Sequence, residues 1–209
     1  MAMLSIILFS SAIAYLLGSI NTSIIVSRLV GKSDIRNFGS GNAGATNTLR
    51  VLGKGAALAV VLGDALKGIL AVLVARFAFE FFGVSGNIRI PQYYAAIFVV
   101  VGHIFPIYFG FRGGKGIMTS IAVIFMLDWE IGVILLLIFA AIFVTTRYVS
   151  LGSCIASVMF PLLVYMFHRG DGAFLAAACL IAALAIIKHR ENIRRLVTGT
   201  ESKTYFGKK

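Results

Sequence analysis

Seven runs of apolar residues divide this 209-residue sequence, and most of them are 17 to 23 residues long. A helix needs roughly 17 to 25 such residues to cross a bilayer, so these runs are long enough to do so. The composition agrees, because 59% of the residues are hydrophobic and only 13% are charged, whereas a soluble domain has about 25% charged residues. The sequence predicts an all-α integral membrane protein with candidate spans at residues 4–26, 55–75, 92–110, 117–128, 130–147, 149–167 and 172–188.

The fourth run is the weak one. Its apolar part has eleven residues, about 17 Å of helix against a hydrocarbon core roughly 30 Å thick. Fusing it with the fifth run would give six spans. Seven spans, in contrast, place fifteen basic residues on one face and leave only Arg76, Arg89 and Arg169 on the other. Because basic loops are cytoplasmic, we expect seven spans, a retained first span with the N-terminus outside, and a cytoplasmic C-terminus.

Three polar islands interrupt the apolar runs, at residues 39–50, 102–116 and 188–203. In the seven-span topology all three emerge on the cytoplasmic side. Three unrelated loops have no reason to share a face, whereas the walls of one site must do so. We therefore expect residues 1–209 to form a single transmembrane domain with its site on the cytoplasmic face.

The first island is rich in glycine and in neutral hydrogen-bonding side chains. Closely spaced glycines let the backbone turn its N–H groups inward, which forms a concavity suited to an anion. An arginine at the end of the island adds a planar fork that matches phosphate or carboxylate. A flexible polar connection is the alternative. The candidate anion-binding residues here are Gly39, Ser40, Gly41, Asn42, Asn47 and Arg50.

The second island contains Gly113, Gly114, Lys115 and Gly116 in succession. This run is not a P-loop, because the glycine and the Ser/Thr that such a loop requires are missing at its two ends and no strand precedes it. Glycine N–H groups at the mouth of a helix, with one ammonium group, can still hold a phosphate. His103, earlier in the island, is either a hydrogen-bonded structural residue or a base, and the structural role is favoured.

Two charged residues, Asp64 and Lys67, stand inside the second run. They are three residues apart, so they share one helical face and can neutralise each other. An unpaired charge at that depth would be costly. The pair is either a structural clasp or a support behind the site, and we slightly favour the support.

The third island begins at the end of the last run and is strongly basic. His189 and Asn192 share a face if this segment is helical, and Glu191 can pair locally with a following arginine. A basic helix that binds anionic lipid beside the membrane is the alternative interpretation.

Taken together, the islands resemble the three cytoplasmic motifs of the bacterial acyl-phosphate:glycerol-3-phosphate acyltransferases, small polytopic enzymes that begin phospholipid synthesis. The resemblance covers residues 39–50, 102–116 and 189–203 as well as the span count and almost the whole length. It implies that an acyl group passes from acyl phosphate to the 1-hydroxyl of glycerol 3-phosphate in the bacterial plasma membrane. It also implies a phosphate-holding loop at Gly113, Gly114 and Gly116, and catalytic roles for Ser40, Arg50, Lys115, His189 and Asn192.

The residue types suit such a reaction. Both substrates carry phosphate, so the site needs cations and N–H donors. Acyl phosphate is an activated mixed anhydride, and the protein therefore mostly positions the substrates and stabilises charge. A substrate phosphate could accept the hydroxyl proton. No residue cluster resembles a metal site, and we expect no cofactor and no nucleic-acid partner; membrane lipids surround the spans.

Two rivals are weighed against this interpretation. A phosphate or organophosphate transporter would also be basic and apolar, but it is expected to show inverted repeats, and none is visible. Thioester-dependent acyltransferases commonly carry a histidine and an aspartate five positions apart. Here the residues five positions after the three histidines are Tyr108, Ala173 and Arg194.

Overall fold

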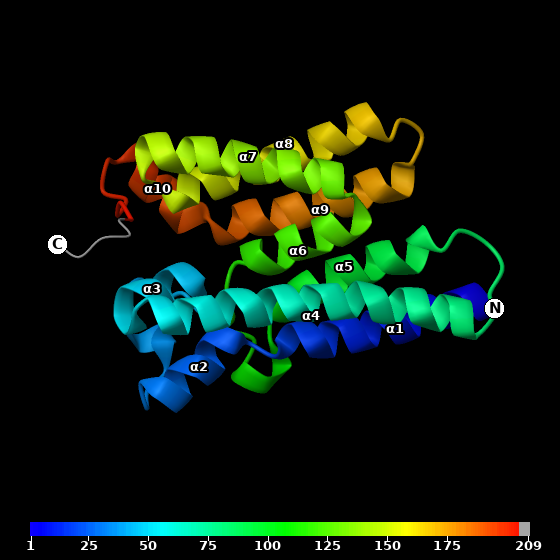
Figure 1. Ribbon diagram of the computed structural model, residues 1–209, viewed down its shortest axis with the longest axis horizontal. Coiled ribbons are helices and arrows are strands. Elements are labelled where there is room, and N and C mark those ends of the chain that lie inside the picture. Colours follow the sequence, from blue (N-terminus) through cyan, green and yellow to red (C-terminus); the bar gives the residue numbers. More distant parts are fainter. Residues whose placement is uncertain (205–209) are drawn as a thin grey trace. The chain divides into compact units, whose positions relative to one another are not determined.

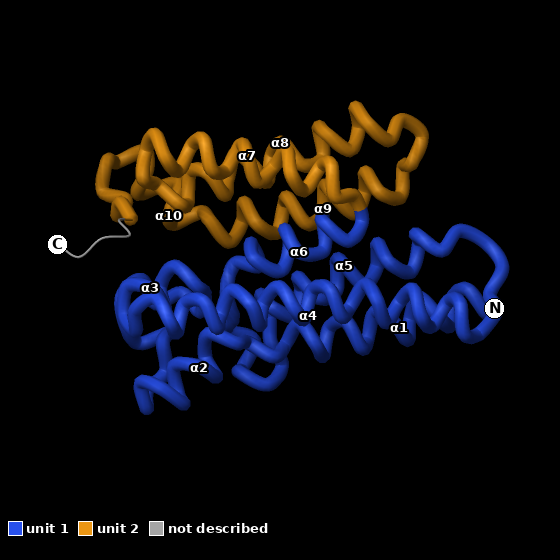
Figure 2. The backbone as a smooth tube through the Cα atoms, viewed as in Figure 1, with its two compact units in different colours: residues 1–127 blue, residues 128–209 orange. Residues whose placement is uncertain are grey.

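The computed structural model describes residues 1–204, and all regular structure in that part of the chain is helical. The chain divides into two compact units, Met1–Leu127 and Asp128–Lys209 (Figure 2). The all-α fold that the apolar runs predict is confirmed for these residues. The expected single domain over residues 1–209 stays a prediction, and each unit is described below by itself.

The bulk of unit 1 is formed by α1 (Ala2–Ser19), α4 (Lys54–Phe81), α5 (Arg89–Ile104) and the shorter α6 (Ile117–Leu127). α1 packs against α4 and α5, and α4 also packs against α5 and α6. Small residues permit the closest crossing, that of α1 with α5: a side chain on Gly18 would overlap the backbone of Val99, and one on Gly102 would overlap the carbonyl oxygen of Tyr15. Close backbone approach at small residues is how helices pack in the absence of a hydrophobic driving force.

The first predicted span is broken in the structure. α1 ends at Ser19, and a second helix, α2 (Thr22–Val30), starts three residues later. Asn21 causes the restart, because its Oδ1 accepts a 3.1 Å hydrogen bond from the backbone N–H of Ile24 and so caps α2. The predicted span over residues 4–26 thus contains a break, although Ala2–Val30 as a whole is long and apolar enough to cross a membrane. Apolar composition does not report a capping asparagine.

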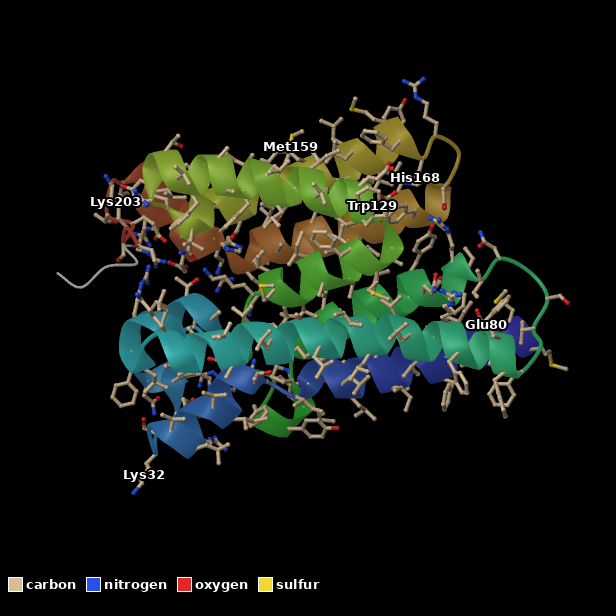
Figure 3. All side chains as sticks on the ribbon, in the orientation of Figure 1. Lys32, Glu80, Trp129, Met159, His168 and Lys203 are labelled. Atoms are coloured by element: carbon tan, nitrogen blue, oxygen red, sulfur yellow. The ribbon has the colours of Figure 1, made fainter. Side chains whose placement is uncertain are left out.

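Short elements follow α2 and build one end of unit 1. They are a 3-10 turn, η1 (Ile35–Asn37), and the helix α3 (Ala45–Leu52), and both α2 and α3 pack against α4. Figure 1 shows α2 and α3 at the end of unit 1 away from the N-terminus. Figure 3 places Lys32 at that end and Glu80 at the opposite one. The first polar island thus has its own compact fold and is not an extended connection.

Unit 2 consists of α7 (Trp129–Thr146), α8 (Val149–Phe167), α9 (Gly172–Lys188) and the short α10 (Arg190–Val197). α8 packs against α7 and α9, and α10 packs against α8 and α9. Asp128 caps α7 and also contacts His168 at the end of α8, which joins those two helices. Figure 3 shows His168 and Lys203 at opposite ends of this unit.

Within the described residues, five helical segments are long and apolar enough to cross a membrane, and a sixth is added if α9 and α10, bent by 59°, count as one. Their bounds follow the predicted runs closely. α6, in contrast, has only eleven residues and falls short of a full span. The predicted count of seven is therefore not confirmed, and neither is the predicted orientation of the termini.

Candidate active site

The predicted site residues fall into both units. Unit 1 carries Ser40, Arg50 and Lys115 together with all the predicted glycines, whereas unit 2 carries His189 and Asn192. The structure brings the first and second islands into contact within unit 1. The third island is organised within unit 2.

Asn47 shapes the glycine loop of the first island. Its Oδ1 accepts a 2.9 Å hydrogen bond from the backbone N–H of Ser40, and its Nδ2 donates to the carbonyl oxygens of Phe38 and Ile35. The side chain is only 1% exposed. Asn47 was predicted to bind substrate, and the structure shows it holding the loop in shape.

Two of the loop glycines occupy backbone conformations that other residues avoid. Gly39 has φ +59° and Gly41 has φ +70°. A side chain at Gly39 would also overlap Oδ1 of Asn47. These turns leave Ser40 exposed at the surface of unit 1, and Arg50 is exposed on α3. α3 is itself joined to α2 by a 2.9 Å hydrogen bond between the hydroxyls of Ser23 and Thr48.

Arg36, three residues before the first island, joins that part of the chain to the second island. Its Nε and Nη2 donate to both carboxylate oxygens of Asp34, at 2.9 and 2.8 Å. Its Nη1 donates to the backbone carbonyl oxygens of Phe109 and Arg112, at 2.8 and 2.9 Å. The hydrogen bonds from Arg36 hold the pKa of Asp34 well below its ordinary value, although partial burial acts the other way. Arg28 also binds Asp34. We call this set of residues the Arg36 clamp: Arg28, Asp34, Arg36, Phe109 and Arg112.

The glycine turn of the second island hydrogen-bonds to the C-terminal end of α5. The backbone N–H of Gly113 donates to the carbonyl oxygen of Ile104, and that of Gly114 donates to the carbonyl oxygen of His103. The last carbonyl oxygens of a helix have no partner within it, and these N–H groups bond to two of them. They were predicted to hold a phosphate, and the structure gives them this other partner. Gly116, with φ +80°, then turns the chain into α6.

Close packing explains why glycines stand in this turn. A side chain at Gly113 would overlap the carbonyl oxygen of His103, and one at Gly114 would overlap the carbonyl oxygen of Ala43 in the first island. Lys115, which follows directly, is half-buried. The turn thus places the backbone of Lys115 one residue after the contact with the loop that carries Ser40.

Behind this turn lies a buried polar trio, Asp64, Lys67 and His103. Lys67 Nζ lies 2.8 Å from Asp64 Oδ1, 2.8 Å from His103 Nδ1 and 3.0 Å from the carbonyl oxygen of Ile20. The pairing of Asp64 with Lys67 that their spacing predicted is confirmed. Sequence spacing did not reveal the contact with His103, which lies on another helix.

In unit 2, His189 lies where α9 bends into α10. Its Nδ1 lies 2.7 Å from the carbonyl oxygen of Ala185. A carbonyl oxygen can only accept, so Nδ1 carries the proton, and Nε2 is the acceptor nitrogen when the ring is neutral. The bend sets the direction of α10 and of Asn192 on its first turn.

Glu201 fixes Asn192 and the end of the third island. It accepts hydrogen bonds from Asn192 Nδ2 at 2.6 Å, Arg195 Nε at 2.7 Å and Ser150 Oγ at 2.8 Å. Burial alone would raise the pKa of Glu201, but these three hydrogen bonds together outweigh it and lower the pKa below its ordinary value. Neither Glu201 nor Arg36 was predicted as part of the site. Glu201 lies inside the third island and Arg36 just before the first, but the partners that tie them to other segments, Ser150 for Glu201 and Phe109 and Arg112 for Arg36, lie too far along the chain for spacing to reveal them.

Comparisons with known proteins identify the family. A family model described as "Glycerol-3-phosphate acyltransferase" matches residues 8–199. The chain belongs to the glycerol-3-phosphate acyltransferase family. Curated glycerol-3-phosphate acyltransferases support this: one from Thermoanaerobacter pseudethanolicus is 46% identical, with 93% of each chain covered, and one from Clostridioides difficile is 43% identical, with 92% of this chain and 93% of the relative covered.

Two solved structures are also similar to this glycerol-3-phosphate acyltransferase. Both are crystal structures of PlsY (YgiH), described as an integral membrane glycerol 3-phosphate acyltransferase. The glycerol 3-phosphate form has a TM-score of 0.85 and 37% identity and covers 95% of this chain and 96% of its own. The lysophosphatidic acid form has a TM-score of 0.82 and 36% identity, with 96% of each chain covered. The predicted family, the glycerol-3-phosphate acyltransferase activity and the integral membrane character are thereby confirmed.

The described residues of this acyltransferase contain no group of three or more His, Cys, Asp or Glu side chains placed to hold a metal ion. The chemistry available at the two islands of unit 1 is cationic and hydrogen-bonding, from Arg50, Lys115 and Ser40. In unit 2 an imidazole and an amide are held in fixed orientations by Ala185 and Glu201.

Proposed function

We propose that this enzyme transfers a fatty acyl group from acyl phosphate to the 1-hydroxyl of glycerol 3-phosphate, as the first step of phospholipid synthesis. The products are lysophosphatidic acid and inorganic phosphate. One observation carries the proposal: two structures that resemble this chain over at least 95% of its length are forms with glycerol 3-phosphate and with lysophosphatidic acid. Substrate and product of the proposed reaction are thus the molecules named for those relatives.

Unit 1 supplies the groups that hold phosphate. The guanidinium of Arg50 and the ammonium of Lys115 provide charge, and the hydroxyl of Ser40 provides a hydrogen bond. The glycine backbones act by geometry, because Gly39, Gly41 and Gly114 let the loop carrying Ser40 and the turn carrying Lys115 approach each other. We assign Asn47 a supporting role through the N–H of Ser40, and Asn42 a place in the substrate-contacting loop.

Unit 2 supplies groups that orient the hydroxyl. In the reaction the 1-hydroxyl oxygen forms a bond to the carbonyl carbon of acyl phosphate, and the bond from that carbon to the phosphate oxygen breaks. The hydroxyl proton passes to the departing phosphate. His189, with its proton on Nδ1, offers Nε2 as an acceptor that orients the hydroxyl, and Asn192 offers a second polar contact. Positioning and charge stabilisation then account for most of the rate.

We further propose seven spans with the active site on the cytoplasmic face of the bacterial inner membrane. The charge asymmetry of the loops supports this orientation. In it α6, too short to cross a bilayer of ordinary thickness, is the fourth crossing. The family match over residues 8–199 includes parts of both units and supports one acyltransferase domain.

The proposal is tested by comparing acyl donors. Purified protein is incubated with labelled glycerol 3-phosphate and either acyl phosphate, acyl-CoA or acyl carrier protein, in the presence of a chelator. We expect labelled lysophosphatidate with acyl phosphate and essentially none with the thioesters, because a thioester has no phosphate at the reacting carbon for the cationic loops to hold or for the hydroxyl proton to be passed to directly. Comparable rates with acyl-CoA would contradict the proposed donor. The variant Arg50→Ala is the inactive control.

A further inference from the structure

The buried trio Asp64, Lys67 and His103 is not used by the chemistry above, yet it lies against the turn that carries Lys115. All three side chains are at most 5% exposed. They come from α4 and α5, two different helices of unit 1. Charged groups at such depth are costly, and a buried ion pair is by itself weak evidence of stabilisation. We therefore ask what these groups do besides stabilising the fold.

The contacts of Lys67 determine where His103 carries its proton. An ammonium group has three donors and no acceptor. Its three near partners are the carboxylate of Asp64, the carbonyl oxygen of Ile20 and Nδ1 of His103. Nδ1 also lies 3.5 Å from Asp64 Oδ1, at the limit of a hydrogen bond, whereas its contact with the ammonium is 2.8 Å. The shorter contact makes Nδ1 the accepting nitrogen, so the proton of the neutral ring resides on Nε2.

That Nε2 atom faces the glycine turn. A side chain at Gly114 would overlap Nε2 of His103 and, from the other side, the carbonyl oxygen of Ala43. The backbone of the same turn is joined to His103 a second time, because the N–H of Gly114 donates to the His103 carbonyl oxygen at 3.2 Å. The imidazole thus packs directly against Gly114, where the turn also meets Ala43 of the first island.

The trio also contacts the break between α1 and α2 and the first turn of α6. Lys67 binds the carbonyl oxygen of Ile20, which the break between α1 and α2 withdraws from helical pairing. The carbonyl oxygen of Asp64 accepts a 3.2 Å hydrogen bond from Thr119 Oγ1, in the first turn of α6 after the glycines. One cluster therefore holds the start of α2, the end of α5 and the start of α6.

We propose that Asp64 and Lys67 are positioning residues that fix His103 as its Nε2–H tautomer against Gly114. The ring thereby sets the shape of residues 113–116 and the placement of Lys115 for a substrate phosphate. This inference rests on the proposed acyl transfer for its kinetic consequence only; the tautomer and the packing are independent of it.

The tautomer is measured first. Nitrogen-15 NMR of histidine distinguishes the two neutral tautomers, and the chain has three histidines. In a tag-free His168→Gln/His189→Gln protein the only remaining signal is that of His103. We expect the Nε2-protonated form. In Asp64→Asn/Lys67→Met, which removes both charges together and leaves neither unpaired, we expect that single form to be lost. Protonation at Nδ1 in the parent protein would overturn the proposal.

Kinetics test the consequence. His103→Asn keeps an acceptor for Lys67 but cannot reach Gly114, whereas His103→Gln extends an amide toward the turn. We expect His103→Asn to raise the KM for glycerol 3-phosphate or for acyl phosphate, but not for both, about tenfold, the size of one lost hydrogen bond. His103→Gln should restore part of the loss. Asp64→Asn/Lys67→Met should show the same selective rise.

Ser11→Ala is the matched control, since it alters a buried hydroxyl of α1 that has no partner among the described residues. It should leave both KM values unchanged. Thermal unfolding of each variant separates loss of fold from loss of positioning. Unchanged KM values in a folded His103→Asn protein would refute the positioning role. If His103→Asn unfolds, the tautomer measurement and His103→Gln still decide. An inactive wild-type protein would refute the proposed function and leave the tautomer result standing.

Discussion

Arg36 Nη1 donates a 2.8 Å hydrogen bond to the backbone carbonyl oxygen of Phe109, 73 residues further along the chain. The same guanidinium binds both carboxylate oxygens of Asp34. One planar group thus orders the segment just before the first island by its salt bridge and joins that segment to the second island. A lysine cannot make these bonds together, because its donors surround a single nitrogen atom.

Replacing Arg36 should therefore harm the enzyme even where charge is kept. We expect Arg36→Lys to lower kcat/KM at least about tenfold, equivalent to roughly 1.4 kcal/mol of transition-state stabilisation, and to lower the melting temperature. Arg28→Lys is the matched control, because Arg28 binds the same Asp34 from a side chain that is 55% exposed. Equal effects of the two substitutions would show that the clamp contributes only surface charge.

Gly114→Ala tests the contact between the islands. The added methyl group would overlap Ala43 and His103, so the turn must shift. Overpacking of this kind costs about 1–3 kcal/mol, and we expect a clear loss of activity with a lower melting temperature. Gly55→Ala, where a new side chain would meet nothing within 4 Å, should be nearly neutral. A fully active Gly114→Ala protein would mean that the turn is not a fixed support for Lys115.

Arg50 is expected to act as a bidentate ligand of phosphate and not as a diffuse charge. Arg50→Lys keeps the charge but loses the planar fork, so its activity should fall nearly as far as that of Arg50→Ala. Initial rates at varied glycerol 3-phosphate and varied acyl phosphate measure the effect on each substrate. If the lysine protein kept most of the activity, the guanidinium geometry would be irrelevant.

Glu201 makes stability depend on pH. Its pKa in the folded protein lies below the ordinary value of 4.5, so its stabilisation is complete above that pH and is lost as the pH falls through the lower, folded-state pKa. We expect Glu201→Gln to melt at a lower temperature than the wild type at pH 7, and the difference to shrink as the pH is taken below 4.5. Glu191→Gln, with a side chain 64% exposed, is the control and should change little. A difference that grew in acid would contradict the sign of this linkage.

The proposed topology is tested by labelling single cysteines from each side of sealed vesicles. In a background without Cys154 and Cys179, cysteines at positions 40, 115 and 189 should all react from the cytoplasmic side. An odd number of spans between the outer N-terminus and the cytoplasmic tail requires this result. Labelling of position 189 from outside would exclude the seven-span arrangement.

The amino-acid sequence determined the class of protein and the family. Apolar runs of membrane-spanning length specify helices by local composition alone, which explains why the predicted run 149–167 coincides with α8 at Val149–Phe167. The pairing of Asp64 with Lys67 was equally accessible, because both lie on one turn of one helix. The island residues carried the resemblance to the acyltransferases, and the family match then confirmed it.

Tertiary structure alone decided what each polar group bonds to. The N–H groups of Gly113 and Gly114 could serve a phosphate or a helix end, and only the path of α5 directs them to its carbonyl oxygens. Lys67 likewise finds His103 because α4 packs against α5. Hydrophobic pattern and helical spacing are local properties of the chain, whereas a hydrogen bond between residues 36 and 109 exists only after the helices have packed.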